Sequence, residues 1–144
     1  MAIRIVVADD DKAVLAAVVD TLGSDDRFDV VATAIDAFTA VDAVREHRPD
    51  AVLLDIRMPG GGVQAAHQIR DTGLPVTVTV ASAKVDAAVI ADLLRAGVRG
   101  VFAKGQLGDA LGDMIVSCVA GQVLLLTPSA AEGVRRYGRG NPAA

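Results

Sequence analysis

Short apolar runs alternate along this chain with longer segments whose apolar residues recur at helical spacing. The runs are rich in β-branched residues and lie at 3–8, 28–32, 51–54, 76–81 and 98–103. Between them, stripes such as Val14, Val18 and Leu22 repeat every three to four residues, as in amphipathic helices. Alternating strand and helix predicts an α/β fold built on a parallel sheet.

The strand-like runs have almost no polar residue on either face. Positions 5–7 read Ile-Val-Val and positions 52–54 read Val-Leu-Leu, without alternation. Strands buried on both faces have this pattern, and helices cover both faces of a parallel sheet. We therefore predict a doubly wound, five-stranded, flavodoxin-like sheet with strand order 2-1-3-4-5, followed by a fifth helix at about 108–120.

Size and charge limit the possible functions. The chain has 144 residues, which suits one domain with one core. Its net charge is −4, the wrong sign for a domain whose own surface binds nucleic acid. The single cysteine, Cys118, excludes an internal disulfide framework and indicates a reducing cytoplasm. We expect no signal peptide, and no apolar run is long enough to span a membrane.

The polar exceptions to this apolar pattern fall at the carboxyl ends of the predicted strands. They are Asp9 and Asp10 after the first strand, Asp55 after the third, Ser82 after the fourth and Lys104 after the fifth. Open parallel sheets bind ligands outside these ends, where the strand order reverses. We expect all five side chains to border one crevice.

Three carboxylates in one crevice repel each other unless a cation lies among them. Hard oxygen ligands in a partly open site suit Mg²⁺. Ser82 and Lys104 would then provide a hydroxyl and a positive charge for phosphoryl oxygens, leaving Asp55 as the nucleophile.

Each residue also has an ordinary structural interpretation when it is considered alone. Two aspartates at a strand end commonly form a turn or cap a helix, and Asp11 fits an N-cap. Asp55 could be a turn residue, Ser82 a helix cap and Lys104 a solvated lysine. The combination at successive strand ends favours the phosphoryl site.

With these residues in place, the chain resembles the receiver domain of two-component response regulators over roughly residues 3–128. The matching motifs are VVADD at 6–10, LLDIRMPG at 53–60, SA at 82–83 and AGVRGVFAK at 96–104. The segments AGQ at 120–122 and LTP at 126–128 further resemble the NarL-like subfamily, which carries a LuxR-type DNA-binding domain after the receiver.

The resemblance implies a role for each site residue. Asp55 would accept a phosphoryl group from a sensor histidine kinase. Mg²⁺ would be held by Asp10, Asp55 and the backbone carbonyl of Arg57, with Asp9 acting through water. The phosphoryl group would be contacted by Ser82, the backbone of Ala83 and Lys104.

The resemblance also implies how the molecule is organised. We expect a receiver domain at 1–128 and a C-terminal helix or linker tail at 129–144. The chain would be a switch that phosphorylates and slowly dephosphorylates itself, and not an enzyme. It would form homodimers and act on DNA and transcription only through an output domain that this sequence lacks. No membrane partner is expected.

One position departs from the family pattern, and two cations border the predicted site. Val101 occupies the position three residues before the lysine, where the family often has an aromatic residue that moves on activation. We therefore expect switching to depend on Ser82. Arg57 and Lys84 lie two positions after Asp55 and Ser82, and either could modulate water access or be a solvated cation.

Three other functions remain as alternatives. A degenerate receiver would serve only for protein contact, but the complete acidic, hydroxyl and lysine set argues against it. A haloacid-dehalogenase-type phosphatase would use Asp9 and Asp11, yet Ala13 stands where that family has Thr or Val, and Asp55 would have no role. A flavodoxin-like cofactor binder would place anionic phosphate against the acids at 9–11.

Overall fold

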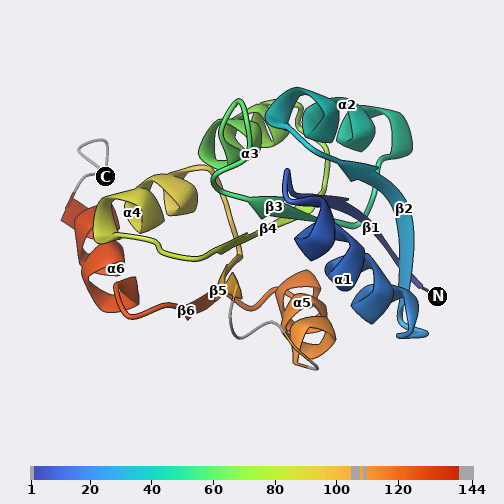
Figure 1. Cartoon of the computed structure of the whole chain (residues 1–144). Helices are drawn as coiled ribbons and strands as arrows, with labels where there is room; N and C mark the ends of the chain where they lie inside the picture. Colours follow the sequence, from blue (N-terminus) through green and yellow to red (C-terminus); the bar gives the residue numbers. More distant parts are fainter. Residues whose placement is uncertain (1, 105–107, 109, 140–144) are drawn as a thin grey trace.

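The computed structural model describes residues 2–104, 108 and 110–139, and Figure 1 shows how its strands and helices follow one another. The strands are β1 (Ile3–Ala8), β2 (Phe28–Ala34), β3 (Ala51–Asp55), β4 (Thr77–Ser82), β5 (Gly100–Ala103) and β6 (Leu124–Leu126). The helices are α1 (Lys12–Gly23), α2 (Ala37–His47), α3 (Gly62–Asp71), α4 (Ala87–Arg95), α5 (Leu111–Val119) and α6 (Ala130–Arg139).

All strands of the sheet are parallel and follow the order β2-β1-β3-β4-β5-β6. The order predicted for the first five strands is confirmed, but the prediction of a five-stranded sheet was one strand short. β6 pairs with β5 in the register Val101 to Leu125. At three residues it is too short for its periodicity to indicate a strand.

The sheet is buried on both faces, as its apolar strands predict. Helices α2, α3 and α4 cover one face, where Val6 and Leu54 lie in the core. Helices α1 and α5 cover the other, where Ile5 and Val7 pack against Ile115. Successive β1 side chains thus enter opposite cores, which places the ligand-binding edge between two helix layers.

Aspartate side chains begin three of the helices that follow the strands. Asp11, Asp36 and Asp86 each accept hydrogen bonds from backbone N–H groups in the first turn of α1, α2 and α4. These caps satisfy amide groups that a helix start leaves unpaired. The caps therefore fix the conformation of the loops that lead from β1, β2 and β4 into the following helices, at the carboxyl edge of the sheet.

The helices are short, and α1, with 12 residues, is the longest in the described part of the chain. No helix among residues 2–104, 108 and 110–139 combines the length and apolar character that crossing a bilayer requires.

Candidate functional site

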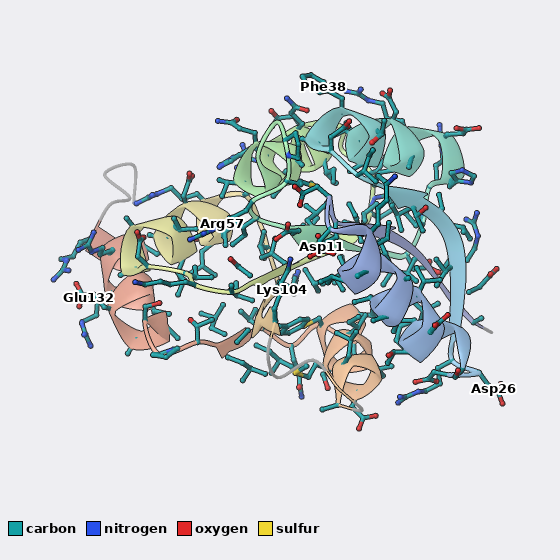
Figure 2. All side chains as sticks on the ribbon, in the orientation of Figure 1. Asp11, Asp26, Phe38, Arg57, Lys104 and Glu132 are labelled. Atoms are coloured by element: carbon teal, nitrogen blue, oxygen red, sulfur yellow. The ribbon has the colours of Figure 1, made fainter. Side chains whose placement is uncertain are left out.

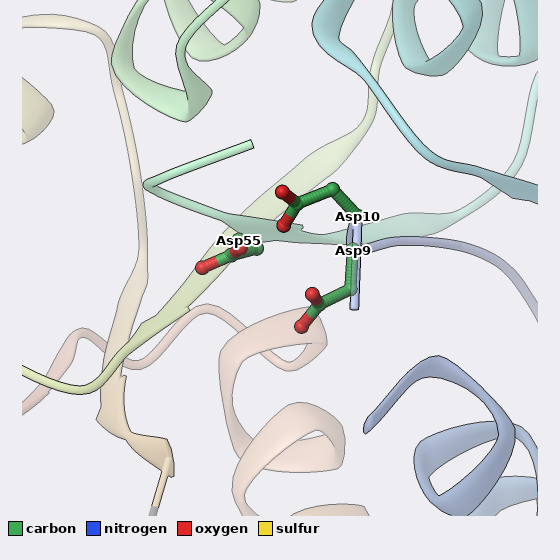
Figure 3. Close-up of side chains that lie close together, drawn as sticks. All are labelled: Asp9, Asp10 and Asp55. Atoms are coloured by element: carbon green, nitrogen blue, oxygen red, sulfur yellow. The ribbon is translucent and has the colours of Figure 1, made fainter. Parts of the chain in front are cut away.

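The acidic residues meet at the carboxyl ends of β1 and β3. The strands are neighbours, with Ala8 opposite Leu54, so Asp9 and Asp55 leave the sheet side by side. One carboxylate oxygen from each of Asp9, Asp10 and Asp55 lies within 4.8 Å of the others. Figure 3 shows the three side chains gathered at these strand ends.

The three consecutive aspartates after β1 have different surroundings. Asp9 is buried, and its Oδ1 accepts a hydrogen bond from the Asp11 backbone N–H at 2.9 Å. Asp10 is exposed at the mouth of the site. Asp11 caps α1 by accepting from the backbone N–H groups of Ala13 and Val14, which confirms its predicted role. The cap holds the loop so that Asp9 and Asp10 face Asp55.

Lys104 reaches these acids from the end of β5, on the far side of β4. Its Nζ lies 2.8 Å from Asp9 Oδ2 and 3.2 Å from Asp55 Oδ1. Two strand spacings, roughly 10 Å, separate β5 from β3, so only a long side chain can cross. In Figure 2, Lys104 lies near the middle of the molecule, away from the solvated Asp26.

The charges in the site are unbalanced. Burial and the neighbouring Asp9 raise the pKa of Asp55, while the Lys104 ammonium partly offsets them. Burial opposes the charged form of Lys104, but the hydrogen bond and charges from Asp9 and Asp55 outweigh it and raise the pKa of that ammonium. Counted by formal charge, three carboxylates and one ammonium sum to −2, and an all-oxygen donor set of this charge fits Mg²⁺.

Ser82 lies at the end of β4, but its hydroxyl is held by its own loop. Ser82 Oγ donates to the backbone carbonyl of Lys84 at 3.1 Å, and the side chain is buried. The Lys84 backbone N–H points back to Ser82 Oγ at 3.4 Å, a weak contact. Ala83 and Lys84 are exposed at the rim.

The remaining predicted positions border the site or underlie it. The backbone N–H of Arg57 approaches Asp55 Oδ1 at 3.4 Å, and its side chain is exposed. Val101 is fully buried in β5, and Phe102 is buried on the opposite core, beside Cys118. Neither residue 101 nor residue 102 presents an aromatic ring to the site.

Sequence reasoning did not identify the role of Gly62, the first residue of α3. A Cβ at this position would lie 2.7 Å from Ile56 Cα and 2.9 Å from the Asp55 carbonyl carbon. Contacts this short with backbone are not tolerated, so only glycine lets α3 start against the end of β3. The run of glycines at 60–62 was the signal in the sequence that could have indicated it.

A family model for the response regulator receiver domain matches residues 5–115. The chain belongs to this family. It is a receiver domain of a two-component response regulator, and its relatives include transcription regulators.

Relatives of this receiver domain extend beyond it. The probable transcriptional regulatory protein NarL of Mycobacterium tuberculosis is 32% identical over 133 residues, which cover 92% of this chain and 61% of that protein. The transcriptional regulatory protein DesR of Bacillus subtilis is 30% identical over 141 residues, covering 97% of this chain and 68% of DesR. The chain thus spans about three fifths of the NarL relative's length.

Solved structures show the same fold. The signal receiver domain of NarL from Mycobacterium tuberculosis superposes with a TM-score of 0.80 at 32% identity, covering 84% of this chain and 98% of that one. A LuxR-family response regulator from Aurantimonas gives 0.83 at 26% identity, covering 96% and 99%.

Proposed function

We propose that Asp55 is the phosphoryl acceptor of this receiver domain, with Mg²⁺ bound by Asp9, Asp10 and Asp55 as its cofactor. The observation that supports this most directly is the meeting of three carboxylates and the Lys104 ammonium at the ends of β1, β3 and β5. Asp10 and the Arg57 carbonyl would be direct ligands, and Asp9 would act through water.

Phosphoryl transfer would proceed by attack of an Asp55 Oδ atom on phosphorus. The new O–P bond forms as the bond from phosphorus to the donor histidine nitrogen of a sensor kinase breaks, and the nitrogen keeps the electron pair. Mg²⁺, when bound, neutralises negative charge on the transferring group. The Lys104 ammonium, already beside Asp55, supplies the same kind of stabilisation from the β5 side.

Ser82 and Ala83 would complete the phosphoryl-binding site. The Ser82 hydroxyl has a single proton, which it now donates to the Lys84 carbonyl. Donating it to a phosphoryl oxygen would require the hydroxyl to leave that carbonyl, and the loop after β4 would then rearrange. Arg57 and Lys84 at the rim would set how readily water reaches the phosphoryl group. Val101 would take no part as an aromatic switch.

The chain would work as a switch in the cytoplasm, and its catalytic contribution would be limited to its own phosphorylation and slow dephosphorylation. Residues 1–128 would form the receiver and 129–144 a linker. Since NarL and DesR are described as transcriptional regulatory proteins, we infer that phosphorylation alters homodimerisation and, through an output domain outside this sequence, binding to DNA.

Thermal unfolding with a phosphoryl mimic tests the proposed acceptor. Beryllofluoride bonds to a carboxylate oxygen, and with Mg²⁺ it should stabilise the wild-type protein by about 2.7 kcal/mol at 100 times its dissociation constant. Asp55→Asn should lose the beryllofluoride response, whereas Asp26→Asn, which neutralises a distant exposed acid, should keep it. Equal responses in wild type and Asp55→Asn would contradict Asp55 as the acceptor, and no response in either would favour a receiver used only for protein contact.

A further inference from the structure

Helix α6 packs along α4 (Figure 1), and at Gly133 the two helices leave no room for a side chain. Gly133 is buried in α6, and a Cβ there would lie 2.6 Å from Ile90 Cβ and 3.3 Å from the Ala87 carbonyl oxygen. Gly138, further along the same helix, is exposed, and a Cβ added there would meet no heavy atom within 4 Å. Contact with α4 therefore depends on the glycine at 133.

The segment before α6 is bonded to the loop that holds Ser82. Ser129 Oγ donates to the backbone carbonyl of Val85 at 2.5 Å. Val85 directly follows Lys84, whose carbonyl accepts the Ser82 hydroxyl. A continuous path of two hydrogen bonds and one peptide link thus joins the predicted phosphoryl-binding hydroxyl to the start of α6.

We propose that residues 127–139 form a latch on the loop after β4 and on α4, which opens when Ser82 turns toward a phosphoryl group. This rests on the proposed role of Asp55 and Ser82. When Ser82 withdraws its proton from the Lys84 carbonyl, residues 83–86 lose the bond that shapes them, and the Val85 carbonyl shifts away from Ser129.

Release of the latch would also unfold α6. The helix has ten residues, and isolated helices of that length are marginal in water. Its buried anchor is Gly133 against Ile90. Once α6 leaves α4, only the ion pairs of Glu132 with Arg135, Arg136 and Arg139 remain among the side-chain contacts of its described residues, and solvated pairs of this kind stabilise a helix weakly. The latch thus converts a change at Ser82 into order or disorder of the segment leading out of the receiver.

Coupling of this kind is reciprocal. If phosphorylation weakens the contact of α6 with α4, then weakening that contact must favour the phosphorylated state. Ser129→Ala, which removes the bond to Val85, and Gly133→Ala, which inserts a methyl group against Ile90, should both increase the equilibrium extent of phosphorylation.

Hydrogen exchange of the α6 amides, read by mass spectrometry, tests the latch. Incubation with a small phosphodonor and Mg²⁺ should speed exchange at 130–139 by roughly tenfold, within the usual range of allosteric coupling. Ser129→Ala and Gly133→Ala should show fast exchange before phosphorylation. Gly138→Ala is the matched control because it adds the same methyl group to α6 in open space, and it should retain slow exchange.

The same spectra separate failure of the latch from failure of the proposed function, because they record the phosphoryl adduct. An adduct with unchanged α6 exchange would overturn the latch and leave the acceptor role intact. If no adduct forms, the acceptor proposal fails, and Ser82→Ala decides on the latch. Removal of the bond to Lys84 should itself speed α6 exchange, and unchanged exchange in that variant would overturn the latch.

Discussion

Asp55 carries a charge that its surroundings oppose. It is buried at the end of β3 beside Asp9, and the nearby Lys104 ammonium is shared between the two carboxylates. An acid in such a place is more easily protonated than in the unfolded chain, because burial and like charge both disfavour the anion. The nucleophile of the proposed reaction is therefore held at a cost in folding stability.

That cost predicts how the stability of Asp55→Asn compares with wild type in a metal-free buffer. The pKa of Asp55 is raised above its usual 3.8, so between pH 3.8 and the raised pKa the folded state binds more protons than the unfolded state. As pH rises through this interval, the free energy of unfolding of the wild type therefore falls relative to that of the variant. Asp55→Asn should melt higher at pH 7 and lose this advantage toward pH 4, as measured by circular dichroism. An advantage that grows toward pH 4 would contradict the assignment.

Lys104 occupies the space around the same carboxylates that Mg²⁺ would use. Lys104→Met removes its positive charge, so Mg²⁺ should bind more tightly, by roughly tenfold or about 1.4 kcal/mol, while phosphorylation slows. Calorimetric titration measures the binding. Lys84→Met removes an exposed ammonium at the rim and serves as the matched control, with a smaller effect expected. Weaker Mg²⁺ binding in Lys104→Met would show that the lysine supports the metal site.

At the scale of single elements, the start of α3 packs closely against the backbone of Asp55. Gly62 lies against the backbone of Asp55 and Ile56, so the loop after β3 can turn this tightly only if residue 62 has no Cβ. The backbone N–H of Gly62 also donates to the Ile56 carbonyl at 2.9 Å. The geometry around Asp55 therefore depends on a residue outside its charge cluster.

Gly62→Ala should be destabilising by about 1–3 kcal/mol, because an added methyl group in a tightly packed place forces backbone shifts. It should also reduce the response to Mg²⁺ and beryllofluoride. Gly23→Ala, in an open position at the end of α1, should be neutral or stabilising by up to about 1 kcal/mol. Equal effects of the two substitutions in urea unfolding would show that the close approach at Gly62 is not limiting.

The elements differ in how far sequence could predict them. The first five strands were found because β-branched apolar runs are distinctive, although β5 begins at Gly100 and not at Val98. Val98 is buried without being in the strand, since its N–H turns back to the Leu93 carbonyl. The positions of Asp9 and Asp55 at the ends of two neighbouring strands were enough to predict that they lie together. The hydrogen bond from Ser82 to the Lys84 carbonyl depends on the geometry of the loop, which hydrophobic periodicity does not encode.

At the scale of the whole molecule, the parallel sheet places the acidic cluster and helix α6 in different parts of the fold. The acids lie at the carboxyl edge, two helix layers bury both faces, and α6 is attached on the α4 side. The apolar runs without alternation predicted the sheet and the burial of both its faces. They could not predict β6 or the attachment of α6, because both depend on pairings between distant segments.

Intact-protein mass after incubation with a small phosphodonor tests the proposed acceptor most directly. The wild-type chain should gain one phosphoryl group, the gain should require Mg²⁺, and Asp55→Asn should show none under the same conditions. An Asp26→Asn control should behave as wild type. An adduct of equal yield in Asp55→Asn, or a Mg²⁺-independent one, would contradict the assignment of Asp55 and of the carboxylate cluster around it.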